Sequence, residues 1–296
     1  MASQIKKVKI YFRGDNGKAV QWQEKIKNWL KKNYPEIKID SPKQSQPQVV
    51  IVLGGDGTIL EAVRLHDQNN PIFFGLNLGH VGFLAAVRGE KDFLTGLEKL
   101  LKGDYEVIEK MQLSAEVARN GKVIFQTYAL NEAVVKHLFG VVNLEVSIND
   151  HLFQTVHGDG VMVSTATGST AYNLSAHGPI VMPNIKCLIL KELLDHDIPT
   201  PSVVIKHDNK VSIKIISFRE QGKFMLTNPS TGSSTEAHSK SLGQAADVVL
   251  IADGSKIFPL KAGDEVVICK HSELVRFAEL EKNYFLKSLQ EKFSFK

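Results

Sequence analysis

A strand-sized apolar run that leads straight into a glycine-rich loop constrains this fold more than any other feature of the sequence. Val49–Leu53 is a continuous apolar run, as expected of a fully buried strand. Gly54-Gly55-Asp56-Gly57-Thr58 follows at once, and apolar residues then recur at helical spacing from Ile59 to Leu65. A strand, a glycine loop and a helix in this order predict one step of a parallel sheet covered by helices.

The same alternation of strand and helix patterns extends over the rest of the N-terminal part. Apolar and polar residues alternate from Val8 to Phe12, and Ile72–Leu76 is a second apolar run. Helical spacing relates the apolar residues of 22–30 and of 93–101. We therefore expect an α/β domain, a parallel sheet with helices, over residues 1–108.

From about Met111 the pattern changes to short alternating runs separated by turn residues. Examples are Leu113–Val117, Leu144–Ile148 and Val211–Ile215, which predict a mainly antiparallel β domain over residues 109–271. Apolar residues four apart return only near the end of the chain, so we expect residues 272–296 to form a helix that packs back on the first domain.

Composition and charge narrow the class of protein. The net charge of +4 comes from scattered lysines without a basic stripe, so nucleic-acid binding is not expected. Two distant cysteines support neither a disulfide framework nor a zinc site and fit a reducing compartment. No apolar run reaches the length of a membrane span, and the first residues carry no secretion signal. A soluble, cytoplasmic protein is therefore predicted.

One polar segment is set apart from this pattern. Residues 227–241 contain eight Ser or Thr residues and almost no large apolar side chain. This composition predicts an exposed, mobile loop, which is either a flap over a site or a tolerated insertion.

The glycine loop is the strongest candidate for chemistry. Glycines at 54, 55 and 57 let backbone N–H groups approach phosphate oxygens, and the following helix adds partial positive charge. A carboxylate here would repel phosphate, so Asp56 is a candidate for accepting the proton of an attacking hydroxyl or for holding Mg²⁺. The alternative is a helix N-cap. No motif identifies a metal-ligand set or a particular phosphate-binding lysine.

Three further motifs follow the glycine loop in order, at residues 77–84, 131–135 and 158–175. The second begins with Asn131-Glu132, and the third contains Gly158-Asp159-Gly160 and Thr167-Gly168-Ser169-Thr170. With these four motifs and a closing helix near Tyr284, the chain resembles the NAD kinases over nearly its whole length. The resemblance implies an α/β N-terminal domain, a β-sandwich C-terminal domain and a homodimer or homotetramer.

The resemblance also implies a reaction and its residues. The terminal phosphoryl group of ATP, or of another donor, would pass to the 2′-hydroxyl of the adenosine ribose of NAD, with Mg²⁺ as the cation. Asp56 would be the catalytic residue. The glycine loop, including Thr58, would bind the phosphates of ATP. The residues implied to bind NAD are Asp56, Gly57, Asn131, Glu132, His157, Asp159, Thr170, Ala171, Tyr172, Asn173, Leu174 and Ser175.

Some positions depart from the family pattern. His157 stands where a basic residue is usual, Ala166 where Pro is usual, and Ser255 where Gln is common. The stretch 187–202 also fits poorly, without an Arg before Val203. These departures bear on substrate preference more than on the type of reaction.

Two other functions share part of this evidence. A related glycine-loop kinase acting on a lipid or sugar alcohol would keep Asp56 but not the later motifs. A non-catalytic NAD-binding regulator would keep the binding residues without the chemistry. Taken singly, the polar residues of the later motifs also fit ordinary roles in turns, helix caps and the core.

Overall fold

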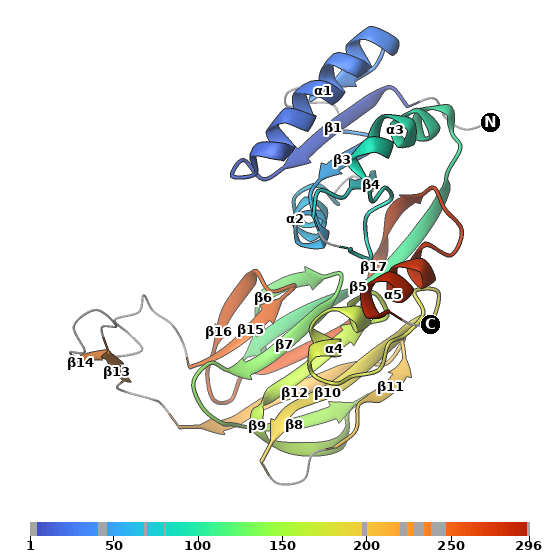
Figure 1. The fold of residues 1–296 in the computed structure, drawn as a ribbon. Helices are drawn as coiled ribbons and strands as arrows, with labels where there is room; N and C mark the ends of the chain where they lie inside the picture. Colours follow the sequence, from blue (N-terminus) through green and yellow to red (C-terminus); the bar gives the residue numbers. More distant parts are fainter. Residues whose placement is uncertain are drawn as a thin grey trace. The chain divides into compact units, whose positions relative to one another are not determined.

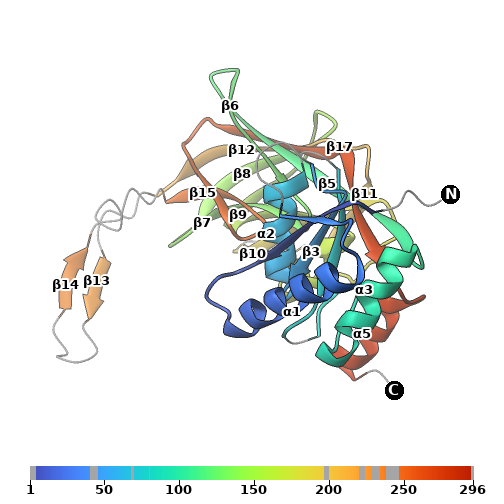
Figure 2. The same ribbon diagram turned by 90° about the horizontal axis from the view of Figure 1, so that it is seen from above.

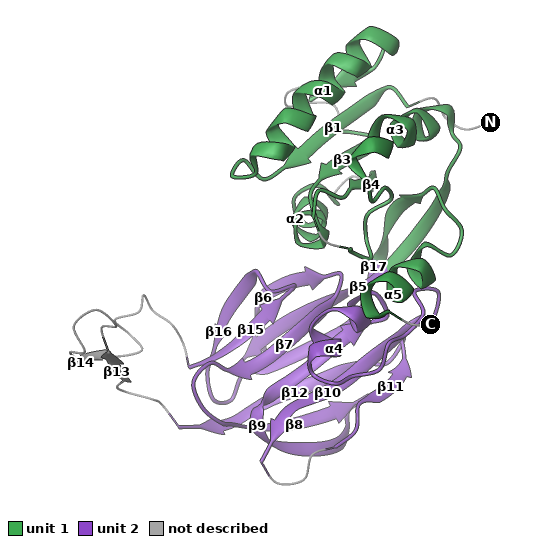
Figure 3. Ribbon diagram, in the orientation of Figure 1, with its two compact units in different colours: residues 1–110, 273–296 green, residues 111–272 purple. Residues whose placement is uncertain are grey.

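The fold was analysed in a computed structural model, which describes residues 5–40, 46–67, 70–79, 81–196, 200–219, 224–227, 234–237 and 247–294. The chain divides into two compact units. Unit 1 contains residues 1–110 and 273–296, and unit 2 contains residues 111–272 (Figure 3). Strands β5 (Glu106–Arg119) and β17 (Glu265–Glu279) carry the chain across the two boundaries. Unit 1 is therefore assembled from two segments of the chain that unit 2 separates in the sequence.

A parallel sheet forms the centre of unit 1. Its strand order is β2-β1-β3-β4, with the end of β17 added beside β4, and every neighbouring pair is parallel. The strands are β1 (Lys7–Phe12), β2 (Lys38–Ile39), β3 (Val49–Leu53) and β4 (Ile72–Leu76). All five residues of β3 are buried, because helices cover both faces of the sheet.

Helices α1 (Gly17–Asn33) and α3 (Phe93–Lys102) lie on one face of this sheet, and α2 (Asp56–His66) lies on the other (Figures 1 and 2). Ile26 of α1 and Leu97 of α3 belong to one buried cluster with Ile51 of β3. Asn16 is the N-cap of helix α1, and its Oδ1 accepts hydrogen bonds from the N–H groups of Lys18 and Ala19 in the first turn.

The last helix of the described chain, α5 (Tyr284–Phe293), packs within unit 1. The Arg88 guanidinium lies 4.4 Å from the ring centre of Tyr284 and donates to the Tyr284 carbonyl at 3.0 Å. It also donates to Ser288 Oγ at 2.8 Å and pairs with Glu291 at 2.6 Å. One arginine therefore contacts this helix at three positions along its length.

Unit 2 is mainly antiparallel β structure (Figure 1). Its strands follow the order β16-β15-β7-β9-β8-β12-β17, with β10 beside β9, β11 beside β10, and β6 beside β5. The strands are β6 (Lys122–Ala129), β7 (Glu132–His137), β8 (Val142–Ile148), β9 (His151–Thr165), β10 (Cys187–Asp195), β11 (Val203–Lys206), β12 (Val211–Phe218), β15 (Val248–Ala252) and β16 (Lys256–Leu260).

Strand β9 changes its partners part-way along its length. Residues 151–158 pair with β8, and residues 160–164 pair with β7 on one side and β10 on the other. A Cβ at Gly158 would lie 2.6 Å from the Leu194 carbonyl oxygen, and one at Gly160 would lie 2.1 Å from that of Val135. Gly160 also has φ +156°. Two glycines are thus required where neighbouring backbones approach the bend.

The predicted fold class is confirmed by the parallel α/β unit and the antiparallel β-rich unit. Of the Ser/Thr-rich segment 227–241, most residues lie outside the described part of the chain. Within it, strand β14 (Ser234–Ala237) pairs with β13 (Phe224–Thr227), which the loop prediction did not anticipate. None of the described helices combines the length and apolar character needed to cross a membrane.

Candidate active site

The glycine loop connects β3 to α2 in unit 1. Gly54 has φ +155°, and a Cβ there would lie 2.5 Å from Thr58 Oγ1. Thr58 is buried, whereas Gly57 is exposed and nothing lies within 4 Å of the Cβ position of Gly55 or Gly57. The loop therefore folds tightly over Thr58 and leaves its middle open to a ligand.

Asp56 is the first residue of α2, and its carboxylate is fixed by the neighbouring loop. Oδ2 accepts a hydrogen bond from the Phe83 N–H at 2.8 Å, and Oδ1 accepts one from the Leu84 N–H at 3.2 Å. A Cβ at Gly82 would lie only 2.3 Å from Oδ1. The first motif (77–84) thus places backbone donors against the carboxylate of the glycine loop, which the separate sequence motifs did not reveal.

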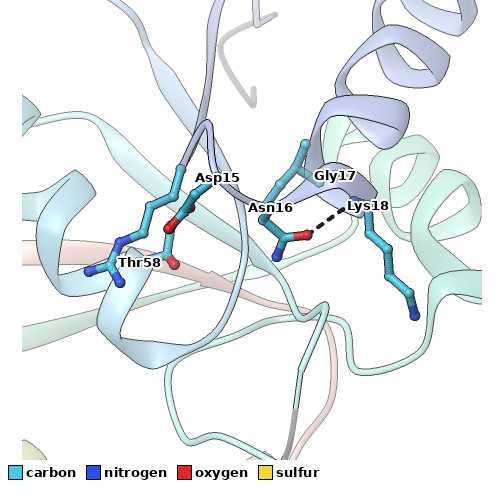
Figure 4. Close-up of a pocket in the computed structure, with 7 residues that line it drawn as sticks. Asp15, Asn16, Gly17, Lys18 and Thr58 are labelled. Carbon is cyan, nitrogen blue, oxygen red and sulfur yellow. Dashed lines mark hydrogen bonds between the residues drawn. The ribbon is translucent and has the colours of Figure 1, made fainter.

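A pocket of about 520 Å³ lies beside this loop in unit 1. Figure 4 shows the residues that line it, from the turn after β1, from the end of β3 and from the glycine loop: Arg13, Asp15, Asn16, Gly17, Lys18, Leu53 and Thr58. Arg13 pairs with Glu61 at 2.6 Å, and Lys18 pairs with Glu90 at 3.2 Å. Two cations and the start of α1 make the pocket suitable for an anionic ligand.

A buried lysine contributes to the electrostatics around Asp56. Lys110 is 9% exposed, and burial lowers its pKa, whereas the charges of Glu279 and Asp56 oppose that change. Burial also raises the pKa of Glu279, an effect that Lys110 opposes. The sequence pattern did not distinguish Lys110 from the other lysines, because its burial depends on the packing of β5 within unit 1.

In unit 2, a turn carrying Asn131 precedes β7. The Asn131 carbonyl accepts hydrogen bonds from Ser164 Oγ at 3.1 Å and from the Thr165 N–H at 2.8 Å. A Cβ at Gly168 would lie 2.3 Å from the same carbonyl oxygen. Two motifs that are well separated in sequence, 131–135 and 158–175, therefore meet through backbone contacts at this turn.

Glu132 follows Asn131 and is the most electrostatically unusual acid of unit 2. It is 7% exposed, and its Oε2 has no hydrogen-bond partner. Burial, and then the nearby charge of Asp253, raise its pKa from near 4.5 to about 8, although a backbone N–H of Tyr172 opposes the change. A buried oxygen without a partner is unusual and suggests a place for a ligand donor.

A second pocket, of about 640 Å³, lies in unit 2. Its walls come from the bend of β9, from α4 (Tyr172–Ser175) and its continuation, and from β10: Asp159, Tyr172, Ser175, Ala176, His177, Lys191, Glu192, Leu193, Leu194, Asp195 and His196. Burial, and then the charges of Asp159 and Glu132, raise the pKa of Tyr172. Three predicted NAD-binding residues, Asp159, Tyr172 and Ser175, thus share one pocket.

Other predicted NAD-binding residues have different surroundings. The buried Asn173 amide donates to the Ser169 and Pro179 carbonyls at 3.2 and 2.9 Å, so it ties the segment together. Thr170 is buried in the 3-10 turn Thr167–Thr170, while Ala171 and Leu174 are half-buried. Contacts of these four residues with NAD stay predictions.

His157 is exposed on β9 and is not among the residues that line the 640 Å³ pocket. Its Nδ1 hydrogen bonds with Asn143 Oδ1 at 2.5 Å, and its ring lies edge-on to that of His196 at 5.9 Å. His196 does line the pocket. His157 therefore adjoins the pocket wall through His196.

The stretch that fits the family pattern poorly supplies much of this wall. Lys191, Glu192 and His196 all lie within it and line the pocket. Glu192 is 5% exposed and accepts a hydrogen bond from the Thr200 N–H, while Lys191 Nζ donates to the Thr200 carbonyl at 3.2 Å. The stretch that departs from the family pattern therefore forms part of the wall of a predicted NAD pocket.

No group of three or more His, Cys, Asp or Glu side chains among the described residues lies close enough to hold a metal ion. A Mg²⁺ ion bound to a nucleotide is usually held by one or two carboxylates and by phosphate oxygens. Asp56, together with the phosphates of a bound donor, fits that smaller requirement.

The family models for the ATP-NAD kinase N-terminal and C-terminal domains match residues 6–105 and 130–240. An NAD kinase of Symbiobacterium thermophilum is 34% identical over 86% of this chain and 81% of its own length. The chain belongs to the NAD kinase family. A second member, from Geotalea daltonii, is 29% identical over 95% of this chain and 96% of its own. The resemblance and the enzyme class predicted from four motifs are confirmed.

Solved structures of NAD kinases share this fold. A yeast NADH kinase complexed with NADH has a TM-score of 0.84 at 19% identity. The match covers 99% of this chain and 89% of the yeast chain. An NAD kinase from Archaeoglobus fulgidus in complex with ATP has a TM-score of 0.71 at 21% identity, with 97% and 98% coverage. Both NAD kinase domains therefore adopt the expected architecture.

Proposed function

We propose that this chain transfers the terminal phosphoryl group of ATP to the 2′-hydroxyl of the adenosine ribose of NAD, giving NADP. The observation that carries the proposal is the fixed carboxylate of Asp56 within a glycine loop beside a pocket lined by Arg13 and Lys18. This combination supplies both an acceptor for a hydroxyl proton and a place for phosphates.

Asp56 aligns the attacking hydroxyl in this proposal. One carboxylate oxygen accepts the 2′-O–H hydrogen bond and takes the proton as the oxygen attacks the terminal phosphorus. The bond from phosphorus to the bridging oxygen breaks, and ADP leaves. The Phe83 and Leu84 N–H groups keep the carboxylate in one orientation, which matters because positioning provides much of the catalysis of phosphoryl transfer.

The donor phosphates occupy the loop of Gly54, Gly55, Gly57 and Thr58, and they extend toward the pocket of unit 1. Backbone N–H groups at the start of α2 suit phosphate oxygens, as do the side chains of Arg13 and Lys18. Mg²⁺, when bound with the nucleotide, neutralises charge on its phosphate oxygens. Asp56 is the described carboxylate of this loop that would adjoin it.

Unit 2 binds NAD. Asn131 and Glu132 hold the adenine and ribose side, and the segment Thr170–Ser175 lines that part of the site. Asp159 holds the nicotinamide side in the 640 Å³ pocket, which Tyr172 also lines, and His157 adjoins this pocket through His196. The unpartnered Oε2 of Glu132 supports this assignment, because a ribose hydroxyl would satisfy it.

The test is an end-point assay for NADP formed from NAD, ATP and Mg²⁺, read with an NADP-specific dehydrogenase. We expect Asp56→Asn to lower turnover by about 10²-fold or more while NAD affinity is retained, as for loss of a general base. Asp104→Asn, an exposed carboxylate in the same unit, is the matched control and should behave as wild type.

The outcomes separate the competing functions. Unchanged turnover in Asp56→Asn would remove Asp56 from the catalytic role. NAD binding without NADP under any donor or metal condition would identify a regulator. Phosphorylation of diacylglycerol or fructose 6-phosphate without reaction of NAD would identify another glycine-loop kinase.

A homodimer or homotetramer in the cytoplasm completes the proposal. Unit 2 exposes adjacent apolar side chains at Leu152 and Phe153, which are 54% and 43% exposed. The thiols of Cys187 and Cys269 are both free, which suits a reducing compartment. Light scattering on a size-exclusion column tests the assembly. A monomer that is fully active at assay concentrations would contradict it.

A further inference from the structure

A single carboxylate in unit 2 accepts three consecutive backbone N–H groups. Asp253 Oδ2 accepts from the Leu130 N–H at 2.8 Å, and Asp253 Oδ1 accepts from the N–H groups of Asn131 and Glu132 at 2.8 and 3.2 Å. The Asp253 N–H in turn donates to the Glu132 carbonyl at 3.1 Å. The turn and Asp253 therefore hold each other through four hydrogen bonds.

This contact connects elements that are far apart in sequence. Asp253 directly follows β15, which pairs with β7, and Ala252 lies opposite Ala133. Asp253 has φ +45°, a left-handed conformation that Asp adopts more readily than most residues. Because Asp253 follows the last paired residue of β15, its side chain reaches the backbone of Asn131 and Glu132 at the start of β7.

The three bonds restrict the backbone from which the Asn131 and Glu132 side chains project. Consecutive N–H groups that converge on one point form an anion-binding nest, and hydrogen bonds to a charged acceptor are stronger than neutral ones. Ser164 and Thr165 hold the opposite, carbonyl side of the same turn. The turn is therefore fixed on both sides through the backbone groups of residues 130–132.

Asp253 also acts on the charge of Glu132. Burial is the first cause of the raised pKa of Glu132, and the Asp253 charge is the second. The other groups facing Glu132 are a backbone N–H of Tyr172, which opposes the change, and the Tyr172 hydroxyl, whose own pKa is raised partly by Glu132 and Asp159. Loss of the Asp253 charge should therefore allow Glu132 to ionise at lower pH.

We propose that Asp253 is a positioning residue for NAD binding, which fixes the Asn131–Glu132 turn through its three backbone hydrogen bonds. The inference rests on the proposed function of that turn. It predicts an effect on NAD affinity, with little effect on ATP affinity or on the phosphoryl step.

The test compares Asp253→Asn, which keeps one acceptor oxygen but removes the charge, with Asp253→Glu, which keeps the charge. We expect Asp253→Asn to raise KM for NAD about tenfold or more, the size expected when buried N–H groups lose a charged acceptor. KM for ATP and kcat should stay within about threefold of wild type. Asp208→Asn, an exposed carboxylate of unit 2 paired with Lys206, is the matched control.

A pH profile separates positioning from a general loss of structure. In wild type, KM for NAD should change as Glu132 titrates, and in Asp253→Asn the midpoint of that change should move to lower pH. Asp253→Glu should restore the wild-type midpoint. An unchanged midpoint in Asp253→Asn, or equal losses in kcat and in both KM values, would overturn the proposal.

Direct titration of NAD keeps this test independent of turnover. If wild type forms no NADP, the proposed reaction fails, but the NAD dissociation constants of the same variants still decide the role of Asp253. If Asp253→Asn does not fold, Asp253→Glu decides. Weaker NAD binding with the wild-type midpoint supports the proposal, and wild-type affinity at every pH overturns it.

Discussion

The two acids proposed to contact NAD, Asp56 and Glu132, are held in opposite ways. The Asp56 carboxylate accepts hydrogen bonds from two backbone N–H groups, which fix its orientation. Glu132 is buried with one oxygen unpartnered, and its pKa is raised to about 8. One carboxylate is therefore oriented by backbone donors, whereas the other keeps its proton into the neutral pH range.

The raised pKa of Glu132 makes the stability of the ligand-free protein depend on pH. Between about pH 4.5 and pH 8, the folded state keeps a proton that the unfolded state releases, so the free energy of unfolding falls as pH rises. Within this window, Glu132 lowers the free energy of unfolding by up to about 1.4 kcal/mol for each unit of pH increase. Glu132→Gln should remove this contribution, as measured by urea unfolding of wild type and variant at pH 5, 6, 7 and 8.

The quantity compared is the difference in free energy of unfolding between wild type and Glu132→Gln at each pH. Groups that titrate alike in both proteins cancel in this difference. Glu145→Gln, an acid of the same unit on β8, should keep the wild-type slope. Identical slopes for wild type and Glu132→Gln would show that Glu132 is ionised at neutral pH in the folded state.

For single residues, the sequence indicated the polar side chains of the candidate site but not the residues that hold them in place. Asp56, Asn131 and Glu132 stand out because glycines or apolar runs adjoin them. Asp253 lies 121 residues from Glu132, so its role depends on β15 pairing with β7. Lys110 likewise becomes distinctive only through burial, which no local pattern reveals.

Among the elements, the strands of unit 1 were the most predictable. Val49–Leu53 and Ile72–Leu76 were predicted with the observed bounds, because short strands buried on both faces are continuous apolar runs. The longer strands of unit 2 were recognised only in part. Strand β9 changes partners at Gly158–Gly160, so its alternation does not follow a single sheet face.

The strand–loop–helix element of the glycine motif gives a prediction about individual glycines. Gly54→Ala should lower the free energy of unfolding by about 1–3 kcal/mol, because its φ is +155° and the new Cβ would meet Thr58. Gly57→Ala should change it by less than about 1 kcal/mol, because no atom lies nearby and Ala favours the helix.

Denaturant unfolding of both variants measures the difference, and Gly57→Ala serves as the matched control. Equal losses of stability in the two variants would show that the loop does not require the Gly54 conformation. A loss of turnover in Gly57→Ala without a loss of stability would instead indicate that phosphate approaches this glycine closely.

For the whole molecule, the main feature is that unit 1 combines residues 1–110 with 273–296. The later segment adds the β17 strand beside β4 and the helix α5 that Arg88 holds. The fold class followed from periodicity alone. The pairing of β4 with Arg276 and Phe277 did not, because residues so distant in sequence leave no local pattern.

Truncation after residue 272 should therefore destabilise unit 1 more than unit 2. Without Arg276 and Phe277, β4 keeps β3 on one side but loses its neighbour on the other, and Phe83 loses the Phe285 ring 5.5 Å away. Amide hydrogen exchange of residues 72–76 should become faster, while that of β7 should change little. Unchanged protection of β4 in the truncated chain would contradict the prediction.

The divided construction of unit 1 also sets an order of events during protein synthesis. After residue 110 leaves the ribosome, all of unit 2 must be made before the strand end and helix that complete unit 1 emerge, a delay on the order of ten seconds. The glycine loop with Asp56 therefore belongs to a sheet that lacks its last strand throughout this interval. A nascent chain should gain phosphoryl-transfer activity only after its final described helix is released, so unfinished chains consume no ATP.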